Sequence, residues 1–231
     1  MQIALPVSLP DDASFDAFFP HAGVAASVSA LQRGLAAPPL RAFLHGPAGS
    51  GRTHLLQACC LEAEARAAPF VYLPLAELLA APPEELLAGL EQCALVCLDD
   101  LDAISGEQAW EEAIFHLYNR LLESGASLLV AARLPPASLA VRLPDLRSRL
   151  QALLVLPLAL PDDESLPGAL VLRAHRRGMT LDQEVARYIL SRAPRGMTEL
   201  IALLDVLDAR SLAAGRRLSI PFVREALDWQ T

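Results

Sequence analysis

The stretch Gly46-Pro-Ala-Gly-Ser-Gly-Arg-Thr53 restricts the fold of this chain more than any other part of the sequence. It fits the spacing G-x-x-x-x-G-K-[ST], with Arg52 in place of the lysine. The stretch follows a strand-like segment, Arg41–His45, and opens a helical pattern that runs to Ala67. Glycines let successive backbone N–H groups turn toward one anion, and a helix start adds positive potential. The loop therefore predicts a nucleotide-phosphate site, and a plain glycine-rich strand–helix turn is the alternative.

The predicted phosphate site spans nine consecutive residues. We expect it to comprise Gly46, Pro47, Ala48, Gly49, Ser50, Gly51, Arg52, Thr53 and His54. In this site Arg52 offers a cation to the β-phosphate, and the Thr53 hydroxyl is a ligand for Mg²⁺. The guanidinium of arginine is planar and larger than the ammonium of lysine. Arg52 therefore disfavours rapid ATP hydrolysis more than it disfavours nucleotide binding. The chain contains no lysine at all, so compositional bias is a second explanation of Arg52, and His54 has a surface or packing role as its alternative.

Short apolar runs alternate with helix-length segments through the first two thirds of the chain. The runs are Phe43–His45, Phe70–Leu75, Ala94–Leu98, Leu128–Ala132 and Leu153–Leu158. Near-continuous apolar strands between helices are typical of a parallel sheet that is covered on both faces. The fold class expected is therefore α/β, with a five-stranded parallel sheet flanked by helices.

The pattern changes near residue 160. After that point we expect only helices, at Asp163–Arg177, Leu181–Arg192, Met197–Ala214 and Pro221–Trp229. The charge changes as well, since residues 1–160 hold 17 acidic side chains and 9 arginines, whereas residues 161–231 hold 10 of each. We therefore predict an extended tail at 1–10, a nucleotide-binding α/β domain at 11–160 and a small all-helical domain at 161–231.

A second motif lies about 50 residues after the glycine loop. Leu95-Val-Cys-Leu98 is followed by Asp99 and Asp100, the pattern of a buried strand that ends in carboxylates. In a phosphate site Asp99 would hold Mg²⁺ through water, and Asp100 would orient the attacking water. An acidic loop at a strand end is the alternative, and the pairing with the glycine loop favours the nucleotide site.

Composition narrows the class of protein further. The formal net charge is −8 and no basic patch is evident, which argues against a dedicated DNA-binding protein. The four cysteines lie in apolar segments without zinc-ligand spacing, so we expect them to be reduced and buried. No apolar run is long enough to span a membrane, and the N-terminus lacks the features of a signal peptide. A soluble, cytoplasmic protein is the expectation.

Several motifs in order resemble one family. They are Ser14-Phe-Asp-Ala-Phe18, Gly46–His54, Leu95–Asp100, Trp110–Asn119, Leu143-Pro-Asp-Leu-Arg-Ser-Arg-Leu150 and Ser219–Leu227. Together they are similar to the ATPase module of the bacterial replication initiator DnaA. The similarity is greatest to the shorter DnaA-related regulators, the Hda branch of this AAA+ family, which share an arginine in the P-loop. No helix-turn-helix segment is found after Thr231, so we expect no direct sequence-specific DNA binding.

This resemblance implies roles for three further parts of the chain. Arg149 matches the arginine that projects in trans, as an arginine finger, at the nucleotide of a neighbouring subunit. The segment Gln2, Ile3, Ala4, Leu5, Pro6 and Val7 resembles the motif that docks on the sliding clamp, the β subunit of DNA polymerase III. Phe18 and the helical lid domain would close the adenine side of a bound ADP. For Arg149 the alternative is a solvated arginine or an ion pair with Asp145. For Gln2–Val7 the alternative is a frayed terminus.

Two positions depart from the family pattern. The first sensor position falls at Ala132 or Arg133, and the lid sensor arginine is replaced by Thr198, with Arg195 three residues earlier. The loss of both sensors favours a protein that holds ADP, with Mg²⁺ as an optional companion, over one that cycles ATP. We therefore expect a clamp-associated regulator that inactivates DnaA and inhibits re-initiation of replication. An autonomous AAA+ ATPase and a nucleotide-stabilised adaptor are the alternatives, and homo-oligomerisation stays open.

Overall fold

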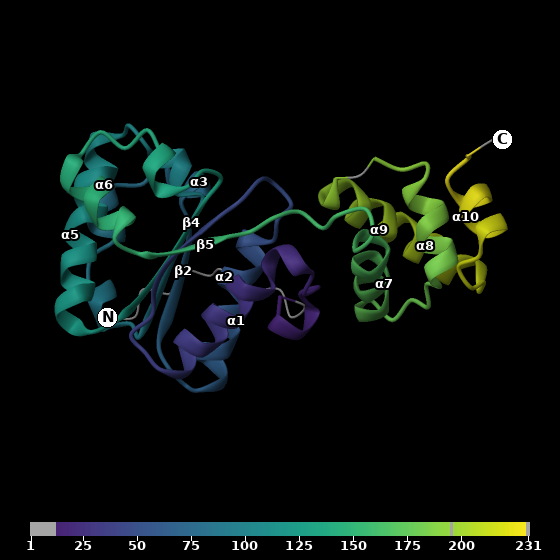
Figure 1. Ribbon diagram of the computed structural model, residues 1–231, viewed down its shortest axis with the longest axis horizontal. Helices are drawn as coiled ribbons and strands as arrows, with labels where there is room; N and C mark the ends of the chain where they lie inside the picture. The colour runs from purple at the N-terminus through teal and green to yellow at the C-terminus, as the bar shows by residue number, and fades with distance from the viewer. Residues whose placement is uncertain (1–12, 195, 230–231) are drawn as a thin grey trace. The chain divides into compact units, whose positions relative to one another are not determined.

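The computed structural model describes residues 13–194 and 196–229, and the chain divides into two compact units between Ala159 and Leu160 (Figure 1). The first unit is an α/β layer structure in which each strand is joined to the next through helical segments. Its elements are η1 Phe15–Ala17, α1 Ala22–Ala36, β1 Arg41–His45, α2 Arg52–Ala65, β2 Phe70–Pro74, α3 Leu75–Leu78, α4 Pro83–Leu86, η2 Leu90–Gln92, β3 Leu95–Asp99, η3 Leu101–Ile104, α5 Gln108–Ser124, β4 Ser127–Ala132, η4 Pro136–Ser138, α6 Pro144–Gln151 and β5 Leu154–Pro157.

The five strands form one parallel sheet in the order β2-β3-β4-β1-β5. His45 of β1 pairs with Ala132 of β4, and Leu98 of β3 pairs with Val130 of β4. The carboxyl ends of these three strands therefore lie at the same edge of the sheet. This register places the glycine loop, the acidic residues after β3 and the residue after β4 within reach of one another.

Alternate side chains of the strands enter two separate cores. Phe43, Val96 and Val130 pack with α5 and α6 on one face. Leu44 and Cys97 pack with α1 and α2 on the other face. Because both faces are covered, the strands are nearly continuous apolar runs, as in other parallel sheets. The predicted fold class, a five-stranded parallel sheet between helices, is confirmed.

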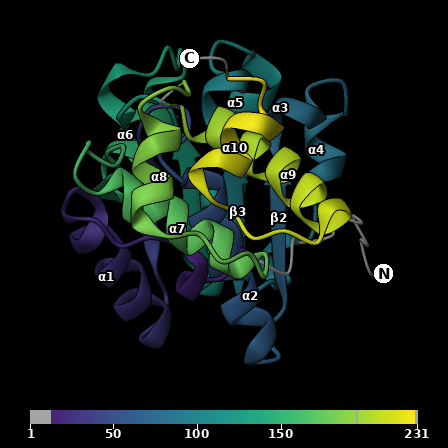
Figure 2. The same ribbon diagram turned by 90° about the vertical axis from the view of Figure 1, so that its right-hand side faces the viewer.

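In its described residues the second unit has four helices, which can be followed in Figure 2. They pack around a core of their own. These are α7 Leu166–Arg176, α8 Gln183–Leu190, α9 Met197–Ala214 and α10 Ile220–Ala226. Gly215 ends α9 in the left-handed conformation with φ +60°, which a glycine adopts without steric cost. Ser219 caps α10 by accepting a hydrogen bond from the backbone N–H of Phe222. The all-helical lid is thus confirmed, with α7, α8 and α10 shorter than the periodicity predicts.

Two features of the first unit differ from the sequence prediction. Residues 144–151 form the helix α6, which is not among the elements expected from the sequence. Pro144 at its first position preorganises the helical turn. Leu154 and Val155 are 48% and 39% exposed, although they lie in the last apolar run. They belong to β5, an edge strand, although Leu73 of the other edge strand, β2, is buried. In the described segments no helix has the length and apolarity to cross a bilayer.

Candidate functional site

The glycine loop has the backbone conformation that only its glycines allow. Gly49 and Gly51 have φ values of +81° and +89°, and Gly51 is the N-cap of α2. A Cβ atom on Gly46 would lie 2.2 Å from the carbonyl oxygen of Leu158, so a side chain there would displace the backbone. The loop is therefore tightly folded between β1, the residue after β5 and the start of α2.

Two buried polar groups on this loop lack hydrogen-bond partners among the described residues. Ser50 is 4% exposed and Arg52 is 8% exposed, and the atoms concerned are Ser50 Oγ and Arg52 Nη1. Buried donors are normally satisfied, so an orphaned pair at a helix N-terminus needs an explanation. A bound phosphate group would satisfy both, since α2 also presents its free N–H groups at this end. Pro47, Ala48 and Gly49 are exposed at the tip of the loop.

The Asp99 carboxylate, 1% exposed, accepts three hydrogen bonds. Thr53 Oγ1 donates to Asp99 Oδ2 at 2.6 Å, and the Tyr72 hydroxyl donates to the same oxygen at 2.8 Å. The backbone N–H of Asp100 donates to Asp99 Oδ1 at 2.9 Å. Burial and then the Asp99 charge raise the pKa of Tyr72 above its ordinary value, so the phenol keeps its proton. Thr53 and Asp99 thus meet as the two motifs predict, with Tyr72 as an unexpected third member.

Arg52 does not extend toward open space over the loop. Its Nη2 atom lies 3.5 Å from Asp100 Oδ1, and its Nη1 atom lies 3.9 Å from Asp102 Oδ1. The backbone of Asp100 has φ +51°, an uncommon conformation for a residue other than glycine. Burial and the neighbouring Asp99 raise the pKa of Asp100, and Arg52 opposes that shift. Asp100 therefore lies in an ion pair with Arg52, and its role in orienting the attacking water stays a prediction.

Arg133 extends this cluster from the end of β4. Its backbone N–H donates to Asp102 Oδ1 at 2.9 Å, and its Nε atom lies 3.5 Å from Asp102 Oδ2. Asp102 thus joins the glycine loop to the position at which the sequence places the first sensor. The described residues hold no group of three or more His, Cys, Asp and Glu side chains arranged to bind a metal ion.

The segment before α1 packs against the glycine loop through Phe18 and His54. A Cβ atom on Gly51 would lie 2.4 Å from the Phe18 ring, and the rings of Phe18 and His54 are 5.5 Å apart. His54 Nε2 lies 2.8 Å from the carbonyl oxygen of Ser14, within hydrogen-bond distance. Phe18 and His54 are therefore brought together at the start of α2, in a packing arrangement.

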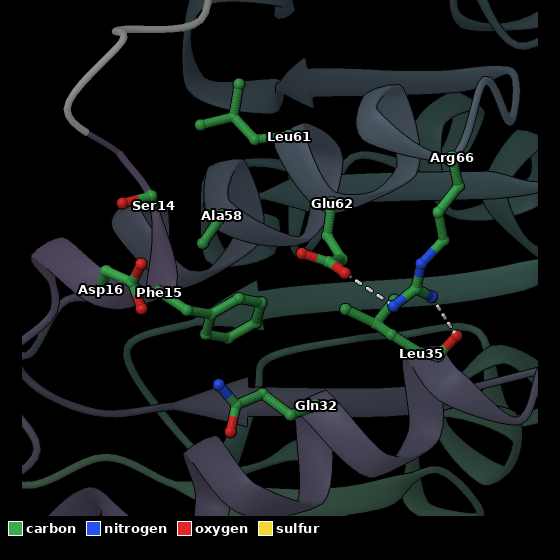
Figure 3. Close-up of a pocket in the computed structure, with 9 residues that line it drawn as sticks. All are labelled: Ser14, Phe15, Asp16, Gln32, Leu35, Ala58, Leu61, Glu62 and Arg66. Atoms are coloured by element: carbon green, nitrogen blue, oxygen red, sulfur yellow. Dashed lines mark hydrogen bonds and ion pairs between the residues drawn. The ribbon is translucent and has the colours of Figure 1, made fainter.

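A cavity of about 440 Å³ lies nearby, between η1, α1 and α2 (Figure 3). Phe15 and Leu35 contribute apolar walls, and Glu62 and Arg66 of α2 form an ion pair at its rim. Arg66 donates to Glu62 Oε1 and to the carbonyl oxygen of Leu35, each at 2.6 Å. No residue of the glycine loop lines this cavity, so it is separate from the phosphate site.

Arg149 lies in the last turn of α6, at the end that leads into β5. Its guanidinium carbon is 5.6 Å from the centre of the Tyr118 ring of α5, and Arg149 is exposed. Among the described contacts, no ion pair joins Arg149 to Asp145. Since β5 runs parallel to β1, Arg149 precedes the amino end of β5, whereas the glycine loop follows the carboxyl end of β1.

A buried carboxylate holds the start of α6 in place. Glu111 of α5, 1% exposed, accepts hydrogen bonds from the backbone N–H groups of Gly106, Arg142 and Leu143 at 2.7–3.1 Å. These contacts join α5 to the segment that precedes α6. Sequence reasoning missed Glu111. In the sequence it looks the same as Glu107 and Glu112, which are exposed, and no local pattern marks it as buried.

Three predicted positions lie wholly or partly beyond the described structure. The proposed clamp motif, Gln2–Val7, and Arg195 lie outside the described residues. Thr198 lies in the first turn of α9, and its side chain is not described.

Tyr72 and Asp102 were missed by sequence reasoning, and the strand-end position of Asp102 beside Asp99 and Asp100 was the only signal for it.

Comparison with known proteins identifies a family for both units. Residues 11–157 match the bacterial DnaA ATPase domain, and residues 162–227 match the Hda lid domain. The first match covers more than half of the chain. The family relationship therefore rests on two sequence matches in the expected order.

Solved structures show the same fold. Domain III of the Thermotoga maritima replication initiation protein DnaA has a TM-score of 0.83 and 21% identity, over 96% of this chain and 98% of that one. DnaA from Aquifex aeolicus bound to AMPPCP has a TM-score of 0.75 and 22% identity, over 89% and 68%. The Thermotoga maritima RuvB Holliday junction branch migration motor has a TM-score of 0.70 and 17% identity, over 96% and 72%. At these identities the structural similarity establishes the fold alone.

Proposed function

Because this chain belongs to the DnaA-related AAA+ family, with an Hda-type lid, we propose that it is an ADP-bound regulator of DnaA. In this proposal the protein associates with the DNA polymerase III sliding clamp and presents Arg149 to ATP held by DnaA. Hydrolysis of that ATP then prevents re-initiation of DNA replication. The protein acts mainly on the ATPase activity of its partner.

The orphaned groups of the glycine loop support nucleotide binding. Ser50 Oγ and the free N–H groups of α2 would bind the phosphates, and Arg52 would contribute as far as its ion pairs with Asp100 and Asp102 allow. Phe18 is close enough to the loop to border the rest of the nucleotide. The DnaA of Aquifex aeolicus with the same fold was solved with AMPPCP, a triphosphate analogue. Mg²⁺, if used, would be held by Thr53 and Asp99 together with phosphate oxygens, as is usual for this ion.

The position of Arg149 is the observation that carries the proposed action on DnaA. The residue is exposed, is not paired with Asp145 among the described contacts, and precedes the strand end opposite to the glycine loop. A side chain placed there is far better suited to the nucleotide of another subunit than to that of its own chain. Arginine keeps its proton and offers a fork to phosphoryl oxygens, and a finger of this kind raises hydrolysis by about 10³–10⁵-fold.

The ion pairs of Arg52 argue against an autonomous ATPase. Asp100, the candidate for orienting water, faces a guanidinium at 3.5 Å, and the position after β4 is occupied by Arg133. A nucleotide-stabilised adaptor without effect on hydrolysis is the remaining alternative. The clamp-binding role of Gln2–Val7 rests on the resemblance of that segment alone.

Single-turnover hydrolysis of ATP on DnaA tests the proposal. The assay contains clamp-loaded DNA and compares the unmodified protein with Arg149→Ala and, as the matched control, Arg147→Ala. We expect Arg149→Ala to bind ADP and clamp normally but to slow the chemical step by about 10³-fold or more. Arg147→Ala should have a milder effect. Stimulation by Arg149→Ala at the level of Arg147→Ala would contradict the finger role of Arg149. A lack of stimulation by the unmodified protein would favour the adaptor.

A further inference from the structure

We infer that Asp102 determines which nucleotide the glycine loop accepts, and that it does so by favouring a diphosphate over a triphosphate. The inference rests on the nucleotide binding proposed above and adds the residue that sets its selectivity. It follows from the contacts that Asp102 makes with the two arginines at the carboxyl edge of the sheet.

Asp102 is a bridge between two cations that come from different parts of the chain. Its Oδ1 atom accepts a hydrogen bond from the backbone N–H of Arg133 and also lies 3.9 Å from Arg52 Nη1. Its Oδ2 atom lies 3.5 Å from Arg133 Nε. The side chains of Asp102 and Arg52 are 25% and 9% exposed, so their interaction is only partly screened by water.

At this edge of the sheet, carboxylates already neutralise most of the positive charge that could bind a phosphate group. Asp99, Asp100 and Asp102 supply three carboxylates, and Arg52 and Arg133 are the guanidiniums paired with this cluster in the described residues. Both arginines are already paired with Asp102. The terminal group of a diphosphate can be bound by the N–H donors of the loop and of α2. An added phosphate group brings more negative charge to a cluster whose arginines are engaged.

Removal of the Asp102 charge should therefore favour the triphosphate. Asp102→Asn keeps a carbonyl oxygen for the N–H of Arg133 and releases Arg52 Nη1 and the Arg133 guanidinium, whereas Arg52 Nη2 stays beside Asp100 Oδ1. The affinity for a triphosphate should rise more than that for a diphosphate, because the triphosphate carries more charge. At the effective dielectric of a partly buried site, one charge a few ångströms away changes the ratio of affinities by about tenfold or more.

Isothermal titration calorimetry on the full chain tests this inference. The probes are ADP and the non-hydrolysable triphosphate AMPPCP, each with Mg²⁺ and with a chelator. Asp102→Asn is compared with Asp102→Glu, which retains the charge, and with Asp145→Asn, which removes a charge from an exposed position on α6. Asp102→Ser, also neutral, repeats the test if Asp102→Asn does not fold.

We expect the original chain, Asp102→Glu and Asp145→Asn to prefer ADP. Asp102→Asn should shift the ratio of dissociation constants toward AMPPCP by about tenfold or more. ADP binding without any difference between Asp102→Asn and Asp145→Asn would overturn the role of Asp102, as would a preference of the original chain for AMPPCP. If the original chain binds neither nucleotide, the proposed function itself fails.

Discussion

Replacement of Tyr72 by phenylalanine should destabilise the α/β unit through a single hydrogen bond. The Tyr72 hydroxyl donates to Asp99 Oδ2 at 2.8 Å, and the Asp99 carboxylate is 1% exposed. Water cannot readily replace the lost donor at such a site. A hydrogen bond to a charged group contributes about 1.5–3 kcal/mol, so we expect the free energy of unfolding to fall by about that amount.

Urea unfolding of the nucleotide-free protein can measure this loss. The chain has one tryptophan in each unit, Trp110 and Trp229, so a Trp229→Phe background makes Trp110 fluorescence report the α/β unit. The unfolding midpoint should fall by roughly 1 M urea. The melting temperature should fall by roughly 3–12 °C for a unit of this size.

Tyr118→Phe is the matched control, because it removes a phenol hydroxyl from the same unit. Tyr118 is buried, but its hydroxyl makes no hydrogen bond among the described residues. Its loss should change the free energy of unfolding by less than about 0.5 kcal/mol. Equal losses for Tyr72→Phe and Tyr118→Phe would refute the assignment of stability to the Tyr72–Asp99 hydrogen bond.

The pH dependence provides a second test of the same contact. Because the pKa of Tyr72 is raised in the folded protein, its contribution to stability is fully present below the ordinary value of 10.0. Above that pH the unfolded phenol ionises first, and the contribution decreases as the pH rises. The difference between Tyr72 and Tyr72→Phe should therefore be constant from about pH 7 to 9 and become smaller above about pH 10.

Two further substitutions test the packing around the site. Gly51→Ala should lower the free energy of unfolding more than Gly125→Ala does, as measured in thermal melts. Both glycines have positive φ, so the backbone strain is matched. A Cβ at Gly51 would lie 2.4 Å from Phe18, whereas nothing lies within 4 Å of a Cβ at Gly125. Equal losses would rule out the Phe18 contact. Glu111→Ala should lower the free energy of unfolding, measured by chemical denaturation, by about 3 kcal/mol or more, because it leaves three backbone N–H groups without their acceptor. Glu112 is exposed, so Glu112→Ala should leave the free energy of unfolding nearly unchanged. A small effect of Glu111→Ala would contradict its role in joining α5 to α6.

The strand and helix pattern follows from local features of the sequence. Strands buried on both faces need near-continuous apolar residues, and the phosphate loop needs glycines where φ is positive. Gly49, Gly51 and the run Leu95–Leu98 satisfy these needs without reference to the rest of the chain. The α/β fold, the helical lid and the candidate phosphate loop could therefore be predicted from the sequence.

The partners of the polar side chains were decided by the tertiary structure. Arg52, Asp102 and Arg133 are distant in sequence, and they meet because the order β2-β3-β4-β1-β5 places β4 between β1 and β3. The same order places Tyr72 of β2 beside Asp99 of β3. Local patterns contain no information on strand order, so they predicted a phosphate ligand in Arg52 and missed its carboxylate partners. Burial likewise depends on what packs over the sheet: Leu154 and Val155 of the edge strand β5 are exposed, whereas Leu73 of the other edge strand, β2, is buried.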